Sequence, residues 1–201
     1  LTGELMTSAT ITDRLVALSR ALIGRIRGGL AQVNVLVSMF FAGMNGSVVA
    51  DTATVGALVL PAMKKAGYPA AFSAAVTGVS STIGGIIPPS IMMIVLANAT
   101  EISIAALFAA GIIPGILIGV VIMVINHYFA VKYNFERSDE PFSVRRAGKE
   151  LYRSSFALLI PLVLVGSVMG GVASVVEAGA ITALVALFTG VFVYRTIKWK
   201  D

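Results

Sequence analysis

Long apolar segments separated by short polar ones run along most of this chain, and some of these segments are broken near their middle. The first broken segment covers residues 30–63 and has the small polar run Asn45-Gly46-Ser47 at its centre. Each arm holds about fifteen residues and reaches roughly 22–24 Å as a helix, whereas the apolar core of a bilayer is about 30 Å thick. Neither arm is long enough to cross a membrane by itself.

This pattern predicts a re-entrant helical hairpin whose tip is formed by residues 45–47. Basic residues flank it on both sides, with Arg25 and Arg27 before it and Lys64 and Lys65 after it. Lys and Arg collect in cytoplasmic loops, so both ends are expected on the inner side. A single crossing would put the lysines outside, and two full crossings would need about forty residues plus a turn. A broken backbone at membrane depth needs protein or a water-filled cavity around it, which makes the tip a candidate binding site.

A second broken segment covers residues 69–99, which as one helix would be about 46 Å long and overshoot the bilayer. Its middle third holds Ser80-Ser81-Thr82, Gly84-Gly85 and Pro88-Pro89-Ser90. Consecutive prolines cannot continue a helix, because N–H donors are missing and the rings clash. We expect a broken helix that meets the hairpin tip near mid-membrane. A kinked span whose hydroxyls bond to their own helix is the alternative.

Composition agrees with an integral membrane protein, since 57% of the 201 residues are hydrophobic and 12% are charged. The chain has no cysteine, which excludes disulfides and thiolate metal sites. Its net charge of +5 comes from basic clusters between apolar segments, so it indicates sidedness and not nucleic-acid binding.

Unbroken crossings are predicted at residues 102–131, 156–171 and 178–194. No set of residues suited to enzymatic chemistry is present, and we do not expect an enzyme.

Two broken helices that meet supply free carbonyls, hydroxyls and helix ends, from which transporters build Na⁺ and carboxylate sites. The predicted Na⁺ ligands are Asn45, Gly46, Ser47, Gly85, Pro88 and Ser90, with glycine and proline contributing carbonyls. The predicted substrate cavity holds Ser47, Asp51, Ser81, Thr82 and Pro89. Helix N-termini at the same place favour an anionic substrate group. For Asp51, complementing the helix dipole is an alternative role.

Several motifs, in order along essentially the whole chain, resemble the large membrane (M) subunit of tripartite ATP-independent periplasmic (TRAP) transporters. They are Phe41-Ala-Gly-Met-Asn-Gly-Ser-Val-Val-Ala-Asp, Leu60-Pro-Ala-Met, Ala66-Gly-Tyr-Pro, Ile86-Ile-Pro-Pro-Ser, Glu101-Ile-Ser-Ile, Leu107-Phe-Ala-Ala-Gly-Ile-Ile-Pro-Gly and Val175-Val-Glu-Ala. The resemblance implies an elevator-type secondary transporter of the bacterial inner membrane, built from inverted repeats. It also implies Na⁺-coupled uptake of an organic acid anion, of the sialic acid or dicarboxylate class. A periplasmic binding protein would deliver the acid, and a small membrane subunit would act as scaffold.

The resemblance also implies that the second hairpin lies beyond residue 201, so the chain is expected to be the N-terminal half to two-thirds of a longer subunit. The predicted layout is an amphipathic arm at 1–28, the hairpin at 29–66, the broken helix at 67–100, a crossing at 101–133, a cytoplasmic linker and surface helix at 134–155, and two crossings at 156–201. Phospholipid head groups are the expected partner of the basic surface helix. An ion channel and a membrane scaffold subunit without a site of its own stay open as alternatives.

Overall fold

The computed structural model describes residues 11–23, 26–135 and 143–189, and in these ranges the chain is helical with no strand, as predicted. The elements are α2 (Ile11–Ile23), α3 (Gly29–Asn45), α4 (Val48–Lys65), α5 (Ala70–Ser81), the 3₁₀ turn η1 (Thr82–Gly85), α6 (Ile91–Thr100), α7 (Ile104–Lys132), α8 (Val144–Met169) and α9 (Val175–Phe188). Parts of the predicted layout lie outside the described residues: arm residues 1–10, linker residues 136–142 and the end of the last crossing at 190–201.

Helices α3 and α4 form an antiparallel hairpin around the predicted interruption. The Asn34 amide of α3 lies 3.7 Å from the sulfur of Met63 in α4, so residues far from the turn pair across it. Gly46 ends α3 in a left-handed conformation with φ of 61°, which glycine adopts without strain. Ser47 is extended, and its hydroxyl accepts a hydrogen bond from the Ala50 N–H, which starts α4.

The second predicted interruption separates α5 from α6. Helix α5 tightens into η1 and then stops, and residues 86–90 form no regular helix before α6 begins. The Ser90 hydroxyl accepts a hydrogen bond from the Met93 N–H at 3.3 Å and so caps the new helix. The prolines at 88 and 89 have no N–H to continue a helix, which accounts for the gap.

Helix α7 packs lengthwise against the hairpin and the broken helix. Three of its glycines leave room for side chains of neighbouring segments to pack closely: Met93 lies against Gly111, Ile87 against Gly115 and Met39 against Gly119. Gln32, near the start of α3, donates a hydrogen bond of 2.8 Å to the carbonyl of Met123 in α7. Since α3 and α7 run in opposite directions, the end of α3 lies level with a point about six residues, or about 9 Å, inside the start of α7.

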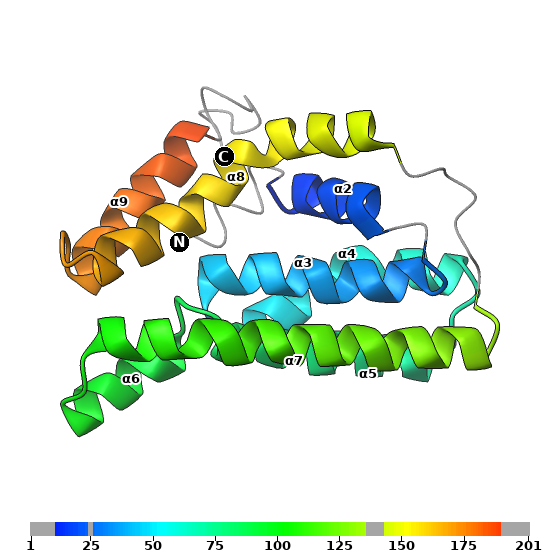
Figure 1. The fold of residues 1–201 in the computed structure, drawn as a ribbon, viewed down its shortest axis with the longest axis horizontal. Helices are drawn as coiled ribbons and strands as arrows, with labels where there is room; N and C mark the ends of the chain where they lie inside the picture. The colour runs from blue at the N-terminus through cyan, green and yellow to red at the C-terminus, as the bar shows by residue number, and fades with distance from the viewer. Residues whose placement is uncertain (1–10, 24–25, 136–142, 190–201) are drawn as a thin grey trace.

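The helix ends sort by charge along the long axis of the molecule. The start of α3, the turn between α4 and α5, and the end of α7 gather at one end, while the turns after α6 and α8 lie at the other (Figure 1). The first group carries Lys64, Lys65 and Lys132, whereas the second carries Glu101 and Glu177. This is the arrangement that the predicted sidedness requires.

Helix α8 joins two elements that the sequence analysis separated. Residues 134–155 were expected to form a linker and a surface helix, and 156–171 a separate crossing, but the chain stays helical from Val144 to Met169. The helix bends near its middle (Figure 1), because Pro161 has no N–H to donate to the carbonyl of Ala157. Its first half lies beside α2, where the Ser154 hydroxyl donates a 3.2 Å hydrogen bond to the Arg14 carbonyl.

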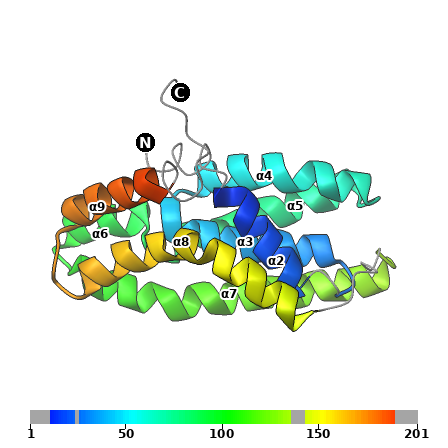
Figure 2. The ribbon, with the colours of Figure 1, turned by 90° about the horizontal axis from the view of Figure 1, so that it is seen from above.

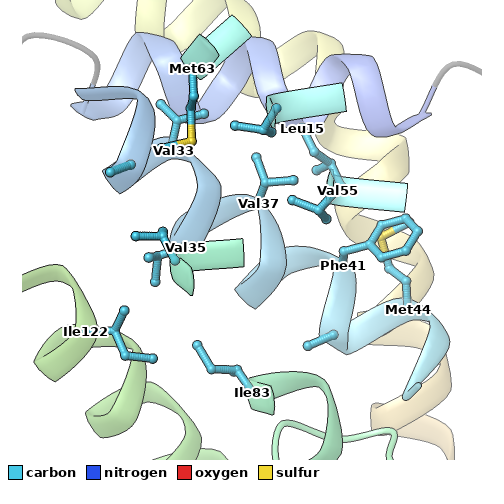
Figure 3. Packing of buried hydrophobic residues seen from close by; sticks show 14 of the residues in the cluster. Leu15, Val33, Val35, Val37, Phe41, Met44, Val55, Met63, Ile83 and Ile122 are labelled. Atoms are coloured by element: carbon cyan, nitrogen blue, oxygen red, sulfur yellow. The ribbon is translucent and has the colours of Figure 1, made fainter. Parts of the chain in front are cut away.

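The main core forms where α3 is covered on several sides. In Figure 2, α4 and α5 lie on one side of α3 and α7 lies on the other. Figure 3 shows Val37 of α3 and Val55 of α4 pointing toward each other, with Leu15 of α2 beside them. All three side chains are fully buried. By length and composition, two of the described helices could cross a membrane, α7 and α8, whereas α3, α6 and α9 are apolar but shorter.

Candidate functional site

The hairpin tip and the break between α5 and α6 are in direct contact. The backbone N–H of Ile91 donates a 3.2 Å hydrogen bond to the carbonyl of Gly46. A Cβ atom added to Gly46 would overlap the carbonyl of Pro89, and one added to Gly84 would lie 3.7 Å from the Ser47 backbone. The two interruptions, about forty residues apart in sequence, therefore pack backbone to backbone.

Four helix ends meet at this contact. Helices α4 and α6 begin there, and the serines that cap them have nearly the same conformation, with φ and ψ of −123° and 115° at Ser47 and −124° and 127° at Ser90. Helix α3 and η1 end there, at Asn45 and Gly85. Helix N-termini carry partial positive charge and C-termini partial negative charge. The N-termini of α4 and α6 can therefore attract an anion, and the C-terminal ends of α3 and η1 can attract a cation, at the same place in an apolar bundle.

The predicted Na⁺ ligands lie around this contact, and two of their oxygens accept a hydrogen bond within the break or within the tip. The Gly85 carbonyl accepts a 2.7 Å hydrogen bond from the Ser90 hydroxyl, and the Asn45 side-chain oxygen accepts one of 3.0 Å from the Ser47 N–H. A carbonyl oxygen has two lone pairs, so each could still bind an ion. The Asn45 amide nitrogen is buried without a partner, while Pro88 and Ser90 are also buried.

The predicted substrate-cavity residues divide into two groups. Ser47 and Pro89 lie at the contact itself. Asp51 and Ser81 are fully buried, and the Asp51 carboxylate faces the hydroxyls of Ser81 and Ser38. Thr82, in contrast, is exposed, and its hydroxyl donates to the Val79 carbonyl of its own helix at 2.7 Å. Thr82 is therefore the one substrate candidate that forms no described contact with the others.

A ladder of polar side chains between α3 and α5 was not singled out in the sequence. The Asn34 amide donates to the Thr77 hydroxyl at 2.7 Å, the Ser80 hydroxyl donates to the Asn34 side-chain oxygen at 3.2 Å, and the hydroxyls of Ser38 and Ser80 lie 3.2 Å apart. All four residues are buried. A signal existed, because Asn34 and Ser38 lie four residues apart and Thr77 and Ser80 three residues apart, which are spacings that put side chains on one face of a helix.

Among the described residues, no group of three or more His, Cys, Asp or Glu side chains could hold a metal ion. The polar atoms near the tip are instead hydroxyls, amides, carbonyls and the single carboxylate of Asp51. Hard oxygen ligands with little negative charge suit Na⁺ better than a transition metal, and hydroxyl and amide groups can donate hydrogen bonds to an organic anion.

Comparison with known proteins places the chain among membrane transport subunits. It is 36% identical over 197 residues to the sialic acid TRAP transporter large permease protein SiaM of Vibrio cholerae serotype O1, covering 98% of this chain and 46% of that protein. It is 36% identical over 201 residues to the C4-dicarboxylate TRAP transporter large permease protein DctM of Pseudomonas aeruginosa, covering 100% and 47%. A third relative is the 2,3-diketo-L-gulonate TRAP transporter large permease protein YiaN of Escherichia coli, 36% identical with 99% and 47% covered. The chain spans about half the length of these relatives.

The family model for the DctM component of tripartite ATP-independent periplasmic transporters matches residues 1–201, and these relatives are similar over nearly the whole chain. The resemblance noted from the sequence motifs is confirmed. Members of this family are transporter permeases and not enzymes. The chain therefore belongs to the DctM family of TRAP transporter large permeases.

Proposed function

We propose that the chain supplies one side of the ion and substrate site of a Na⁺-coupled secondary transporter that takes up an organic acid anion across the bacterial inner membrane. In this proposal a periplasmic binding protein delivers the acid, and a small membrane subunit supports the large one. The observation that carries the proposal is the contact between the two broken helices, where the Ile91 N–H bonds to the Gly46 carbonyl. Family membership supports it, because the relatives are named for transport of sialic acid, C4-dicarboxylates or a diketo sugar acid.

The same contact supports a re-entrant hairpin that moves with the broken helix. The hairpin stops about 9 Å short of the start of α7, and its polar tip packs against protein, as a broken backbone in a membrane requires. The backbone ends of α3 and η1 favour Na⁺, and the N-termini of α4 and α6 favour the carboxylate of the substrate. An elevator movement would carry this polar contact past the scaffold.

The test is uptake by the full-length large subunit, reconstituted with its small subunit and cognate binding protein, using sialic acid, a C4-dicarboxylate and a keto acid under imposed Na⁺ gradients. We expect saturable uptake that requires both Na⁺ and the binding protein. Replacement of the tip by Asn45→Ala with Ser47→Ala is expected to weaken Na⁺ affinity by about tenfold or more, since two oxygen ligands are lost. Conductance without saturation would instead indicate a channel. Unchanged Na⁺ affinity in the tip variant would indicate that residues 45–47 are structural.

A further inference from the structure

Asp51 is a fully buried carboxylate whose two oxygens make no hydrogen bond in the described structure. It lies in the first turn of α4, one turn beyond the tip, on the face that packs against α3 and α5. A carboxylate removed from water is costly unless an opposite charge or hydrogen-bond donors compensate it. A membrane environment makes the cost greater, and ionisable groups there usually serve a function.

The surroundings of Asp51 contain oxygen atoms but no cation. Its carboxylate faces the hydroxyls of Ser81 and Ser38, and the Ser81 hydroxyl also has no hydrogen-bond partner. Among the described residues no Lys or Arg is paired with Asp51, and the ion pair present between side chains joins Arg153 to Glu150 in α8. Where α3, α4 and α5 pack together, the Asp51 carboxyl therefore has no positively charged side chain of the described ranges to compensate its ionised form.

The hydroxyl of Ser38 also belongs to the polar ladder. Its oxygen lies 3.2 Å from the Ser80 oxygen, and either hydroxyl could be the donor in that contact. Ser80 can also donate to the Asn34 side-chain oxygen at 3.2 Å or to the Thr77 carbonyl at 3.1 Å. The hydroxyls of Ser38 and Ser81 are neutral, so neither supplies the positive charge that a buried carboxylate requires, whereas their oxygen lone pairs can bind a cation.

We propose that Asp51, Ser38 and Ser81 bind a monovalent cation, Na⁺ in the working transporter, at a second site behind the hairpin tip. The proposal rests on the proposed Na⁺-coupled function and adds to it a site with an anionic ligand. The tip site is built from neutral oxygens, whereas this one has a formal charge that a single monovalent ion neutralises. A divalent ion would leave excess charge, because Asp51 is the only acidic side chain among the buried polar residues in the described ranges.

The position of this site would couple ion binding to the shape of the hairpin. Ser38 belongs to α3, Asp51 to α4 and Ser81 to α5, so one ion would contact both arms of the hairpin and the helix that leads into the break. The backbone N–H of Asp51 also donates a 2.9 Å hydrogen bond to the Ser47 carbonyl at the tip. An ion bound by Asp51 would therefore stabilise the conformation of the tip through the first turn of α4.

Direct Na⁺ binding tests the proposal. We would measure the amount of ²²Na⁺ bound at saturation, with K⁺ and Li⁺ as competitors, on the full-length subunit and its small subunit in lipid nanodiscs. Asp51→Asn keeps the shape and removes the charge, and we expect it to bind one Na⁺ fewer than the wild type. Ser81→Ala and Ser38→Ala are expected to weaken the affinity of that ion by about tenfold, since each removes one ligand to a charge.

Ser73→Ala is the matched control, because Ser73 is a buried serine of the same helix α5 whose hydroxyl bonds only to the Pro69 carbonyl in the described structure. We expect it to leave Na⁺ binding unchanged. An Asp51→Asn protein that binds as many Na⁺ ions as the wild type overturns this second site, while the proposed function stands. A wild type that binds no Na⁺ overturns both. If Asp51→Asn does not fold, the two serine variants decide: unchanged affinity in both overturns the site.

Discussion

Two turns between helices in this protein have almost the same local design and opposite surroundings. In the turn between α3 and α4, left-handed Gly46 precedes Ser47, which caps α4, and Asp51 lies in the first turn of that helix. In the turn between α8 and α9, left-handed Gly171 precedes Ser174, which caps α9, and Glu177 lies in the first turn. The difference is that the first turn is packed against another broken helix and the second is exposed.

The exposed turn satisfies its polar groups locally. Glu177 accepts hydrogen bonds of 2.8 Å from the Ser174 N–H and 2.7 Å from the Ser174 hydroxyl, which together form a capping box. These bonds lower the pKa of the Glu177 carboxyl below its usual value. Asp51 has no such partner and is buried. The same sequence elements therefore build a turn that satisfies its own polar groups in one place and, in the other, a turn followed by a buried carboxylate without a hydrogen-bond partner.

Replacing the left-handed glycine of each turn by alanine should give the largest difference in uptake between the two turns. Gly46→Ala places a Cβ on the Pro89 carbonyl and adds left-handed strain, whereas Gly171→Ala adds only the strain, because nothing lies within 4 Å of the new atom. The strain costs about 1–2 kcal/mol in each case. We expect Gly46→Ala to lower Na⁺-driven uptake by about 100-fold or more. Displacing a precisely positioned group by about 1 Å can cost roughly that factor, and the new Cβ would displace the tip from the break. Gly171→Ala should retain most uptake, and equal losses in the two variants would contradict the comparison.

The capping serines give the next largest contrast. Ser90→Ala removes the cap of α6 and leaves the Gly85 carbonyl without its 2.7 Å hydrogen bond in a largely buried position. The combined cost is about 2–4 kcal/mol. Ser174→Ala removes a cap at an exposed turn and should cost about 1 kcal/mol. Thermal melting of the two full-length variants in detergent would measure the difference, and a larger loss for Ser174→Ala would count against it.

The glycines of α7 test whether close packing is confined to the broken region. Gly115→Ala would push a Cβ into Ile87, in the segment between η1 and α6, at a cost of about 1–3 kcal/mol. Gly166→Ala in α8 meets nothing within 4 Å, so we expect no loss and up to about 1 kcal/mol of gain from helix propensity. Melting temperatures and uptake of both variants provide the check. A loss at Gly166 as large as that at Gly115 would show that close packing extends to α8.

The smallest expected effect is the pH dependence of the exposed turn. Because the pKa of Glu177 is lowered in the folded protein, its contribution to stability is present at neutral pH and is lost as the pH falls through the lowered pKa. The difference in melting temperature between wild type and Glu177→Gln should therefore be small at pH 7 and vanish at strongly acidic pH. A difference that grows on acidification would contradict this sign.

The sequence predicted the positions of both interruptions because the signals are local. Gly46 and Ser47 end one helix and begin another through their own backbone and side chain, and Pro88 and Pro89 cannot extend a helix. The contact between the interruptions was predicted from membrane depth, and the hydrogen bond from Ile91 to Gly46 joins them. The surface helix predicted within 134–155 and the crossing predicted at 156–171 are parts of one helix, α8. Pro161 bends this helix without ending it.

The surroundings of individual side chains were much harder to predict. Ser38 and Ser81 reach the carboxylate of Asp51 because α3, α4 and α5 pack in one particular register, and a register between helices is a tertiary property that helical spacing alone does not determine. Thr82 illustrates the same limit, because it follows buried Ser81 directly but faces outward. One residue of rotation on a helix changes the direction of a side chain by about 100°.

The hydrogen bond between Ile91 and Gly46 uses only backbone atoms, so apart from proline at position 91 no side-chain substitution deletes it directly. Its amide hydrogen is consequently a natural reporter. While tip and break stay together, this hydrogen is shielded from exchange with solvent deuterium, and it becomes labile only when they part. Deuterium uptake at residue 91, followed with and without Na⁺ and substrate, would reveal at a single position whether the two broken helices travel as one body or open during each transport cycle.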